Sequence, residues 1–224
     1  YGCFKAINFF EMPEEGTDFY YLKEVPHGDV RIMKYKSQVN SHIKACFVYT
    51  PPGYEEKRDR EYPVLYLQHG AGENETGWIW SGKLNLILDN LIEEKKCTEM
   101  IVVMCCGYSF IPETDPVFYP GDFDKELTED CIPCIEKEFR VKKGRAYRAI
   151  AGLSMGSAQA MLTFAKHQNL FGYLGVFSGM ADTELDKILT EKTYAAYHIF
   201  LSCGKGEERL LEKQQTACMQ LLEQ

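Results

Sequence analysis

Hydrophobic and polar residues alternate in two short runs early in the chain, and the later runs are apolar throughout. The alternating runs, 30–35 and 44–49, predict strands with one buried face, and the turn residues Thr-Pro-Pro-Gly at 50–53 end the second run. The later runs predict strands that are buried on both faces, as in a parallel sheet covered by helices. These strands are expected at 63–68, 100–104, 147–153, 173–177 and 198–202.

Between these runs, apolar residues recur at helical spacing and predict the helices that cover the sheet. Leu84, Ile87, Leu88, Leu91 and Ile92 form one apolar stripe, and similar stripes lie within 127–139, 158–165 and 210–222. In the stretch 127–139, Pro133 either kinks the helix or opens its second half. The order of elements predicts an α/β fold: a mostly parallel, doubly wound sheet with helices on both faces and antiparallel N-terminal strands. We expect one domain at 25–224, after an N-terminal extension at 1–24.

Composition and charge exclude several classes of protein. The chain has 224 residues, of which 45% are hydrophobic and 26% charged, as in soluble globular proteins and unlike disordered ones. The net charge of −8 is spread along the chain, so we expect no nucleic acid and no anionic membrane as partner. No apolar run reaches the ~18 residues that span a bilayer.

The cysteines suggest neither a disulfide scaffold nor a metal site. Nine cysteines is an odd number, so at least one thiol is free or pairs between molecules, and we interpret most of them as small core residues. Cys131 and Cys134 form a lone C-x-x-C without the second ligand pair of a zinc site, so we predict no metal. The chain starts at Tyr1 and shows no export signal, so its localisation is not directly readable.

The pentapeptide Gly-Leu-Ser-Met-Gly at 152–156 lies between a predicted strand and a predicted helix. A G-x-S-x-G at such a junction is a nucleophile elbow, in which a tight turn between glycines presents the serine hydroxyl above the sheet. The helix N-terminus behind it favours negative charge on a substrate oxygen. Ser154 is therefore the candidate nucleophile.

The sequence Gln-His-Gly-Ala-Gly at 68–72 follows an earlier apolar strand and supplies the second candidate element. Acyl transfer needs two backbone amides that bind the oxyanion, one from the residue after the nucleophile and one from a loop after an upstream strand. We assign these roles to Met155 and Ala71. His69 is expected to hold this loop by hydrogen bonds and to have no catalytic role.

A carboxylate beyond a late strand is the third element, because the triad in this fold runs Ser, then Asp or Glu, then His. Glu207 and Glu208 follow the strand predicted at 198–202, and either stands where the acid is required. Adjacent acids at the start of a helix can also simply complement the helix dipole.

Several motifs together resemble the feruloyl esterase and esterase D-like family, carbohydrate esterase family 1. They are Tyr-Thr-Pro-Pro-Gly-Tyr at 49–54, Tyr-Pro-Val-Leu-Tyr-Leu-Gln-His-Gly at 62–70, Glu-Thr-Gly-Trp at 75–78 and 151–156, in the correct order. The resemblance implies an α/β-hydrolase that cleaves phenolic acids or acetate from plant cell-wall xylan without a cofactor. It maps the acid onto Glu207 and places Trp78 near the acyl pocket. Trp78 and Tyr108, in aromatic-rich loops, are candidate substrate contacts, although both could instead pack the loops down.

The general base is missing from the pattern, since all five histidines precede Glu207. We therefore expect that the sequence stops before the catalytic His, without the last strand and helix of the fold. A fragment, completion by another chain and a non-catalytic relative are the explanations left open. An absent last strand would expose a sheet edge, which favours homo-oligomers.

The sequence thus predicts a serine carboxylesterase of feruloyl or acetyl-xylan type, with plant cell-wall polysaccharide or acylated oligosaccharides as partners. The enzymatic alternative is an S-formylglutathione-hydrolase-like thioesterase or an acyltransferase. A non-enzyme alternative is an inactive carbohydrate-binding or scaffold protein that retains the hydrolase fold. A polymeric substrate implies a secreted or periplasmic protein, whereas the odd thiol count also fits the cytoplasm.

Overall fold

The computed structural model describes residues 10–12, 14–109, 121–179 and 196–207. In this part of the chain, seven strands form one sheet in the order β1-β2-β4-β3-β5-β6-β7. The strands are β1 (Asp29–Lys36), β2 (Ile43–Thr50), β3 (Val64–Gln68), β4 (Ile101–Cys105), β5 (Arg148–Leu153), β6 (Tyr173–Phe177) and β7 (His198–Ser202). All seven lie within one residue of the ranges expected from the apolar runs.

The directions of the strands confirm a mostly parallel sheet with an antiparallel start. β2 pairs antiparallel with both β1 and β4, and the pairs among β4, β3, β5, β6 and β7 are parallel. The carboxyl ends of β3, β4, β5, β6 and β7 therefore meet at one edge of the sheet. Ligands of open α/β sheets bind beyond this edge.

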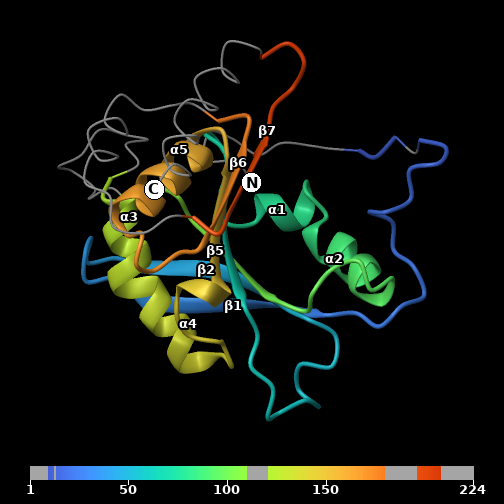
Figure 1. The fold of residues 1–224 in the computed structure, drawn as a ribbon, viewed down its shortest axis with the longest axis horizontal. Coiled ribbons are helices and arrows are strands. Elements are labelled where there is room, and N and C mark those ends of the chain that lie inside the picture. The colour runs from blue at the N-terminus through green and yellow to red at the C-terminus, as the bar shows by residue number, and fades with distance from the viewer. Residues whose placement is uncertain (1–9, 13, 110–120, 180–195, 208–224) are drawn as a thin grey trace.

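Helices cover both faces of the sheet, as expected for an α/β-hydrolase (Figure 1). α1 (Gly77–Trp80) and α2 (Leu84–Glu93) lie on one face, and α3 (Phe123–Lys125), α4 (Ile132–Glu138) and α5 (Met155–Lys166) on the other. A short 3-10 helix, η2 (Arg145–Tyr147), precedes β5.

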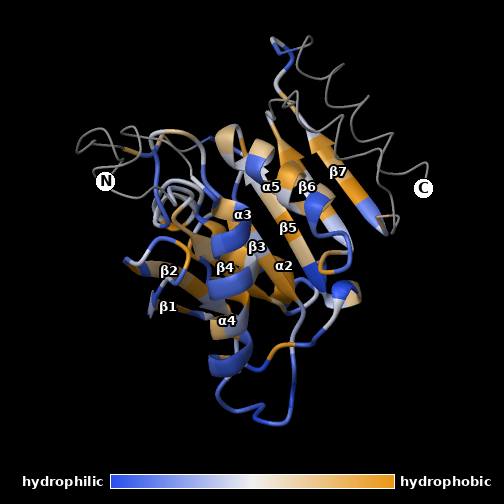
Figure 2. Ribbon diagram, turned by 90° about the vertical axis from the view of Figure 1, so that its left-hand side faces the viewer, coloured by the Kyte–Doolittle hydropathy of each residue, from blue (hydrophilic) through white to orange (hydrophobic). Residues whose placement is uncertain are grey.

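Two apolar cores explain this layering, because alternate residues of a strand point to opposite faces. In β4, Ile101, Val103 and Cys105 belong to the core under α5 and α4, whereas Val102 and Met104 belong to the core under α1 and α2. Figure 2 shows the largely apolar strands, with hydrophilic residues on α3 and α4 in front of them.

The stretch 127–139 departs from a simple α-helix. It begins as a π-helix, η1 (Glu126–Cys131), and continues as α4, which has Pro133 in its first turn. The helical backbone runs on through this point, because the Ile132 amide still donates to the Leu127 carbonyl of η1. Pro133 lies at the start of α4 and thus opens the second half of the helical stretch.

The cysteines are only partly core residues. Cys46, Cys105 and Cys131 are buried, whereas Cys97, Cys106, Cys134 and Cys203 are half-buried, and all seven are free thiols. The other two cysteines, the helix expected at 210–222 and Glu208 lie outside the described residues.

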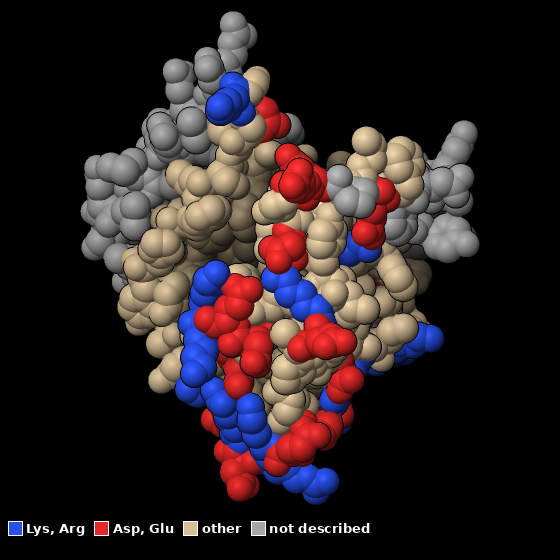
Figure 3. Space-filling model, turned by 90° about the vertical axis from the view of Figure 1, so that its right-hand side faces the viewer, with Lys and Arg blue, Asp and Glu red and all other residues tan. Residues whose placement is uncertain are grey.

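The surface carries charges of both signs. On the face shown in Figure 3, Lys and Arg side chains lie beside Asp and Glu side chains, without an extended basic area. Ion pairs at the surface include Lys57 with Glu99 and Lys23 with Glu94. None of the helices in the described ranges combines the length and apolar character needed to cross a bilayer.

Candidate active site

Ser154 forms the turn between β5 and α5 in a backbone conformation that few residues adopt. Its φ of 53° and ψ of −115° are unfavourable for a residue with a side chain, and such strain is concentrated at active sites. The turn is held from both sides: the Ser154 amide donates to the Phe177 carbonyl (3.0 Å), and the Ser157 hydroxyl donates to the Ser154 carbonyl (2.6 Å). The Ser154 side chain is half-buried at the carboxyl edge of the sheet, as a nucleophile elbow requires.

The loop after β3 lies directly against this turn. A Cβ built on Gly70 would be 3.7 Å from the Cβ of Ser154 and 3.6 Å from the carbonyl oxygen of Leu153. On the other side of the turn, a Cβ on Gly156 would be 2.5 Å from the carbonyl oxygen of His69. The two candidate segments, 68–72 and 152–156, are therefore in contact through glycines.

Hydrogen bonds hold some backbone amides of these segments and leave others open, among them those of Ala71 and Met155. The Gly70 amide donates to Glu73 Oε2 (2.9 Å), and the Gly72 amide donates to the Tyr108 hydroxyl (2.9 Å). Within the described residues, the amides of Ala71 and Met155 donate to no protein group. These are the two amides expected to bind the oxyanion.

His69 is buried and makes hydrogen bonds through both ring nitrogens. Nε2 accepts from the Gly107 amide (2.8 Å), so Nδ1 carries the proton and donates to the Gly70 carbonyl (2.8 Å). Burial lowers the pKa of His69, which keeps the ring neutral. His69 thus ties the loop after β3 to the loop after β4, as expected of a structural residue.

Glu207 lies beyond the end of β7. Its Oε2 accepts from the Gly204 amide (2.9 Å), and this hydrogen bond, together with one from the Ser178 side chain, lowers the pKa of the carboxyl group. Ser178 follows β6, and its amide donates to the Ser202 carbonyl (2.7 Å). Glu207 is therefore an ionised carboxylate at the same edge of the sheet as Ser154.

The two aromatic candidates are held by the protein itself. The Trp78 indole nitrogen donates to the Gln68 carbonyl (3.0 Å), and its ring lies 6.1 Å from that of Phe177. Tyr108 is 8% exposed, and its ring centroid lies 5.7 Å from that of His69. These contacts give both side chains a packing role beside the loops of the site.

None of the other histidines lies where it could act as base for Ser154. His27 binds Asp89 Oδ2 (2.9 Å), and His167 follows the carboxyl end of α5, about 20 Å along the helix from Ser154. His42 lies in the β1–β2 hairpin, three strands from β5, and His198 begins β7 at the opposite edge of the sheet. A catalytic histidine beyond these five therefore stays a prediction.

Residues 37–224 match the Esterase family model, described as "Putative esterase". The chain belongs to this esterase family. It is 39% identical over 214 residues to an "Endo-1,4-beta-xylanase/feruloyl esterase" of Xylanibacter ruminicola, a match that covers 92% of this chain and 29% of that protein. It is 29% identical over 174 residues to "Endo-1,4-beta-xylanase Y" of Acetivibrio thermocellus, covering 70% of this chain and 14% of that protein. The chain therefore spans less than a third of the length of these curated relatives.

A solved structure shows the same fold. The CE1 ferulic acid esterase AmCE1/Fae1A of Anaeromyces mucronatus, in complex with ferulic acid, superposes with a TM-score of 0.77. The match has 23% sequence identity and covers 89% of this chain and 84% of that chain. The resemblance of this esterase to feruloyl esterases of carbohydrate esterase family 1, with an α/β-hydrolase fold, is thereby confirmed.

Two features near the site were not predicted from the sequence. One is a cavity beside α5, and the other is a buried ion pair between Lys44 and Glu126. Lys44 shares the inward face of β2 with Cys46 and Val48. A lysine at an inward position of an alternating strand indicates a buried charge, so the sequence could have predicted a buried partner for it.

Proposed function

We propose that this chain carries the nucleophile of a serine carboxylesterase that releases ester-linked phenolic acids from plant cell-wall xylan. The observation that carries the proposal is the arrangement at Ser154. A serine in a strained strand-to-helix turn adjoins two amides, of Ala71 and Met155, that have no partner in the described part of the chain. Acyl transfer needs this combination of a presented hydroxyl and open donors.

In the proposed reaction, Ser154 Oγ attacks the ester carbonyl carbon as a general base takes its proton. The carbonyl oxygen becomes negative and accepts hydrogen bonds from the Ala71 and Met155 amides. Collapse of the tetrahedral intermediate breaks the ester bond, and the protonated base gives its proton to the leaving sugar hydroxyl. Water then attacks the acyl-enzyme, releasing the acid and restoring the Ser154 hydroxyl.

The base in this scheme is a histidine outside the five of this sequence, supplied by the same polypeptide or by another chain. Glu207 orients it and stabilises its charged form, because the carboxylate is already ionised at the sheet edge. Without such a histidine, turnover falls by roughly a millionfold.

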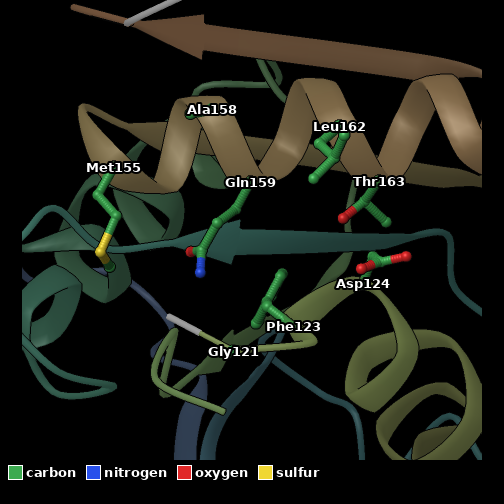
Figure 4. A pocket seen from close by; sticks show the side chains of 8 residues that line it. All are labelled: Gly121, Phe123, Asp124, Met155, Ala158, Gln159, Leu162 and Thr163. Atoms are coloured by element: carbon green, nitrogen blue, oxygen red, sulfur yellow. The ribbon is translucent and has the colours of Figure 1, made fainter. Parts of the chain in front are cut away.

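A cavity beside Met155 favours an aromatic acyl group. It has a volume of about 130 Å³, close to the ~150 Å³ of an apolar cavity that binds benzene. Figure 4 shows that it extends along α5 from Met155, with Phe123 on the facing side. The lining is largely apolar and includes Ala158 and Leu162.

Two polar side chains, Gln159 and Thr163, also line this cavity. Gln159 Nε2 donates to the Gly107 carbonyl (2.7 Å), which leaves Oε1 as an acceptor. Gln159 Oε1 and Thr163 Oγ1 are buried and have no hydrogen-bond partner in the described part of the protein.

A polymeric cell-wall substrate also implies that the esterase works outside the cytoplasm. The relatives from Xylanibacter ruminicola and Acetivibrio thermocellus carry xylanase in their names, which supports xylan as the polymer.

Hydrolysis of methyl ferulate by the complete natural polypeptide that carries these residues, beside Ser154→Ala, tests the proposal. We expect release of ferulate by the wild type and loss of turnover in Ser154→Ala, with unchanged circular dichroism. Turnover that persists in Ser154→Ala contradicts the serine mechanism. Binding of xylan fragments without any turnover favours an inactive carbohydrate-binding protein.

A further inference from the structure

A buried ion pair lies near the site and has no part in the proposed reaction. Lys44 of β2 is 8% exposed and Glu126 of η1 is 1% exposed, and Nζ lies 3.2 Å from Oε2. Burying two charges costs several kcal/mol per ion, so such a pair persists only with further hydrogen bonds. Glu126 also opens a π-helix, and π-helical turns are frequent at functional sites.

On one side, the pair belongs to a network that fixes the β1–β2 hairpin. The Tyr35 hydroxyl donates to Glu126 Oε1 (2.9 Å), and Asn40 Nδ2 donates to Oε2 (2.9 Å). One turn further along η1, Asp130 Oδ2 accepts from the Ser37 hydroxyl (2.6 Å). These contacts explain the stability of the hairpin but not the buried cation.

The Lys44–Glu126 pair also forms hydrogen bonds with the loop after β4. Lys44 Nζ donates to the Tyr108 carbonyl (2.6 Å), and the Ser109 hydroxyl donates to Glu126 Oε2. Tyr108 in turn accepts a hydrogen bond from the Gly72 amide through its hydroxyl (2.9 Å). The connection therefore runs from the ion pair through Tyr108 to the residue next to Ala71.

We infer that Tyr108 is a positioning residue for the oxyanion hole and that the Lys44–Glu126 pair holds it in place. This rests on the proposed function, because it assumes that the Ala71 amide binds the oxyanion. Oxyanion donors act at 2.7–3.1 Å from the developing charge, and a shift of about 1 Å can cost ~10²-fold in rate. The Tyr108 hydroxyl fixes the peptide adjoining Ala71 and so sets this distance.

The inference separates Tyr108 from a residue that contacts substrate. A substrate contact would contribute to ground-state binding, so its loss would raise KM. A positioning residue acts in the transition state, so its loss lowers kcat and leaves KM unchanged. The ring of Tyr108 is buried and its hydroxyl is engaged with Gly72, which favours the second behaviour.

The test uses Tyr108→Phe, which removes the acceptor and keeps the ring, in the complete natural polypeptide. We expect kcat for methyl ferulate to fall about 10- to 100-fold, with KM within twofold of wild type. The neutral pair Lys44→Met with Glu126→Gln should give a similar fall. Adding Tyr108→Phe to that pair should give little more, because both changes act through one connection.

Tyr49→Phe is the matched control. Tyr49 is also buried, and its hydroxyl donates to a buried carboxylate, Asp89 Oδ1 (2.7 Å), on the other face of the sheet. It should lose stability and keep kcat. A wild-type kcat in Tyr108→Phe, a raised KM alone, or additive losses overturn the inference. If Ser154→Ala loses turnover while Tyr108→Phe keeps the wild-type kcat, the inference fails and the proposed function stands.

Amide hydrogen exchange tests the inference without any measurement of esterase activity. The Gly72 amide is protected by the Tyr108 hydroxyl, so Tyr108→Phe should speed exchange in residues 70–73, and Tyr49→Phe should not. Unchanged exchange in residues 70–73 of Tyr108→Phe overturns the inference even for a protein that shows no esterase activity.

Discussion

The α-carbon of Gly152 faces the carbonyl oxygen of Gly156 so closely that a Cβ on Gly152 would lie 2.1 Å from that oxygen. Real Cβ atoms do not approach an oxygen to this distance, so β5 and the first turn of α5 can meet only through a glycine. This contact closes the turn that presents Ser154. A Cβ on Gly156 would likewise lie 2.5 Å from the His69 carbonyl oxygen, so both glycines of the pentapeptide are required by packing.

Gly152→Ala should lower the free energy of unfolding by ~1–3 kcal/mol or more, the usual cost of overpacking. The new Cβ would clash with the backbone of Gly156, which cannot move aside as a flexible side chain can. Gly206→Ala is the control, since a Cβ there meets nothing within 4 Å. Urea unfolding of both variants checks the prediction. Equal stability of Gly152→Ala and wild type would show that the turn can open.

Glu207→Gln should lower kcat for methyl ferulate by roughly 10³- to 10⁴-fold, because a neutral amide cannot stabilise the charged form of the base. Glu208→Gln, a change at the neighbouring acid, should stay within a few-fold of wild type. Steady-state kinetics of the two variants separates the candidates. A larger fall in kcat for Glu208→Gln than for Glu207→Gln would assign the acid to Glu208.

Ala158→Phe should fill the cavity beside α5 and weaken the use of aromatic esters. Because burial of the ring would contribute ~1.5–3 kcal/mol, its loss corresponds to a fall of about 10- to 150-fold in kcat/KM for methyl ferulate. Hydrolysis of 4-nitrophenyl acetate, whose acyl group needs no such space, should change little. A parallel fall for both esters would mean that the substitution disturbs the turn at Ser154 and does not act through acyl binding.

His69 should make stability depend on pH. Burial lowers its native pKa, so below the ordinary histidine value of ~6.5 the unfolded chain binds a proton that the native protein does not. This contribution to stability is complete above pH ~6.5 and falls by up to ~1.4 kcal/mol per unit as the pH drops towards the native pKa. His69→Gln should flatten that part of the profile. Equal slopes for wild type and variant in urea unfolding between pH 8 and 5.5 would contradict a neutral, buried His69.

The strands and their directions could be predicted because a strand that is buried on both faces consists of a continuous run of apolar residues. Ile101 to Cys105 is such a run, and each of its residues packs into one of the two cores. The π-helical turn at Glu126 could not be predicted, because its cause is tertiary. Glu126 is held by Tyr35 and Asn40, which lie 91 and 86 residues away in sequence.

The candidate site could be predicted only as far as local sequence determines it. The turn at Ser154 follows from the glycines around it, and the roles proposed for Ala71 and Met155 are inferred from their places after strands. The cavity lined by Phe123 and Gln159 joins two segments that have no local relation in sequence. The contact from Tyr108 to Gly72 likewise depends on how two loops meet at the sheet edge.

Covalent labelling tests the nucleophile most directly. A fluorophosphonate probe forms a bond between its phosphorus and a serine oxygen with loss of fluoride, and its phosphoryl oxygen occupies the place of the oxyanion. After reaction with the complete natural polypeptide, peptide mass spectrometry should find the adduct on Ser154 and no adduct in Ser154→Ala. Inactivation of the esterase with the adduct on a different residue, or esterase activity that survives in Ser154→Ala, would contradict the account.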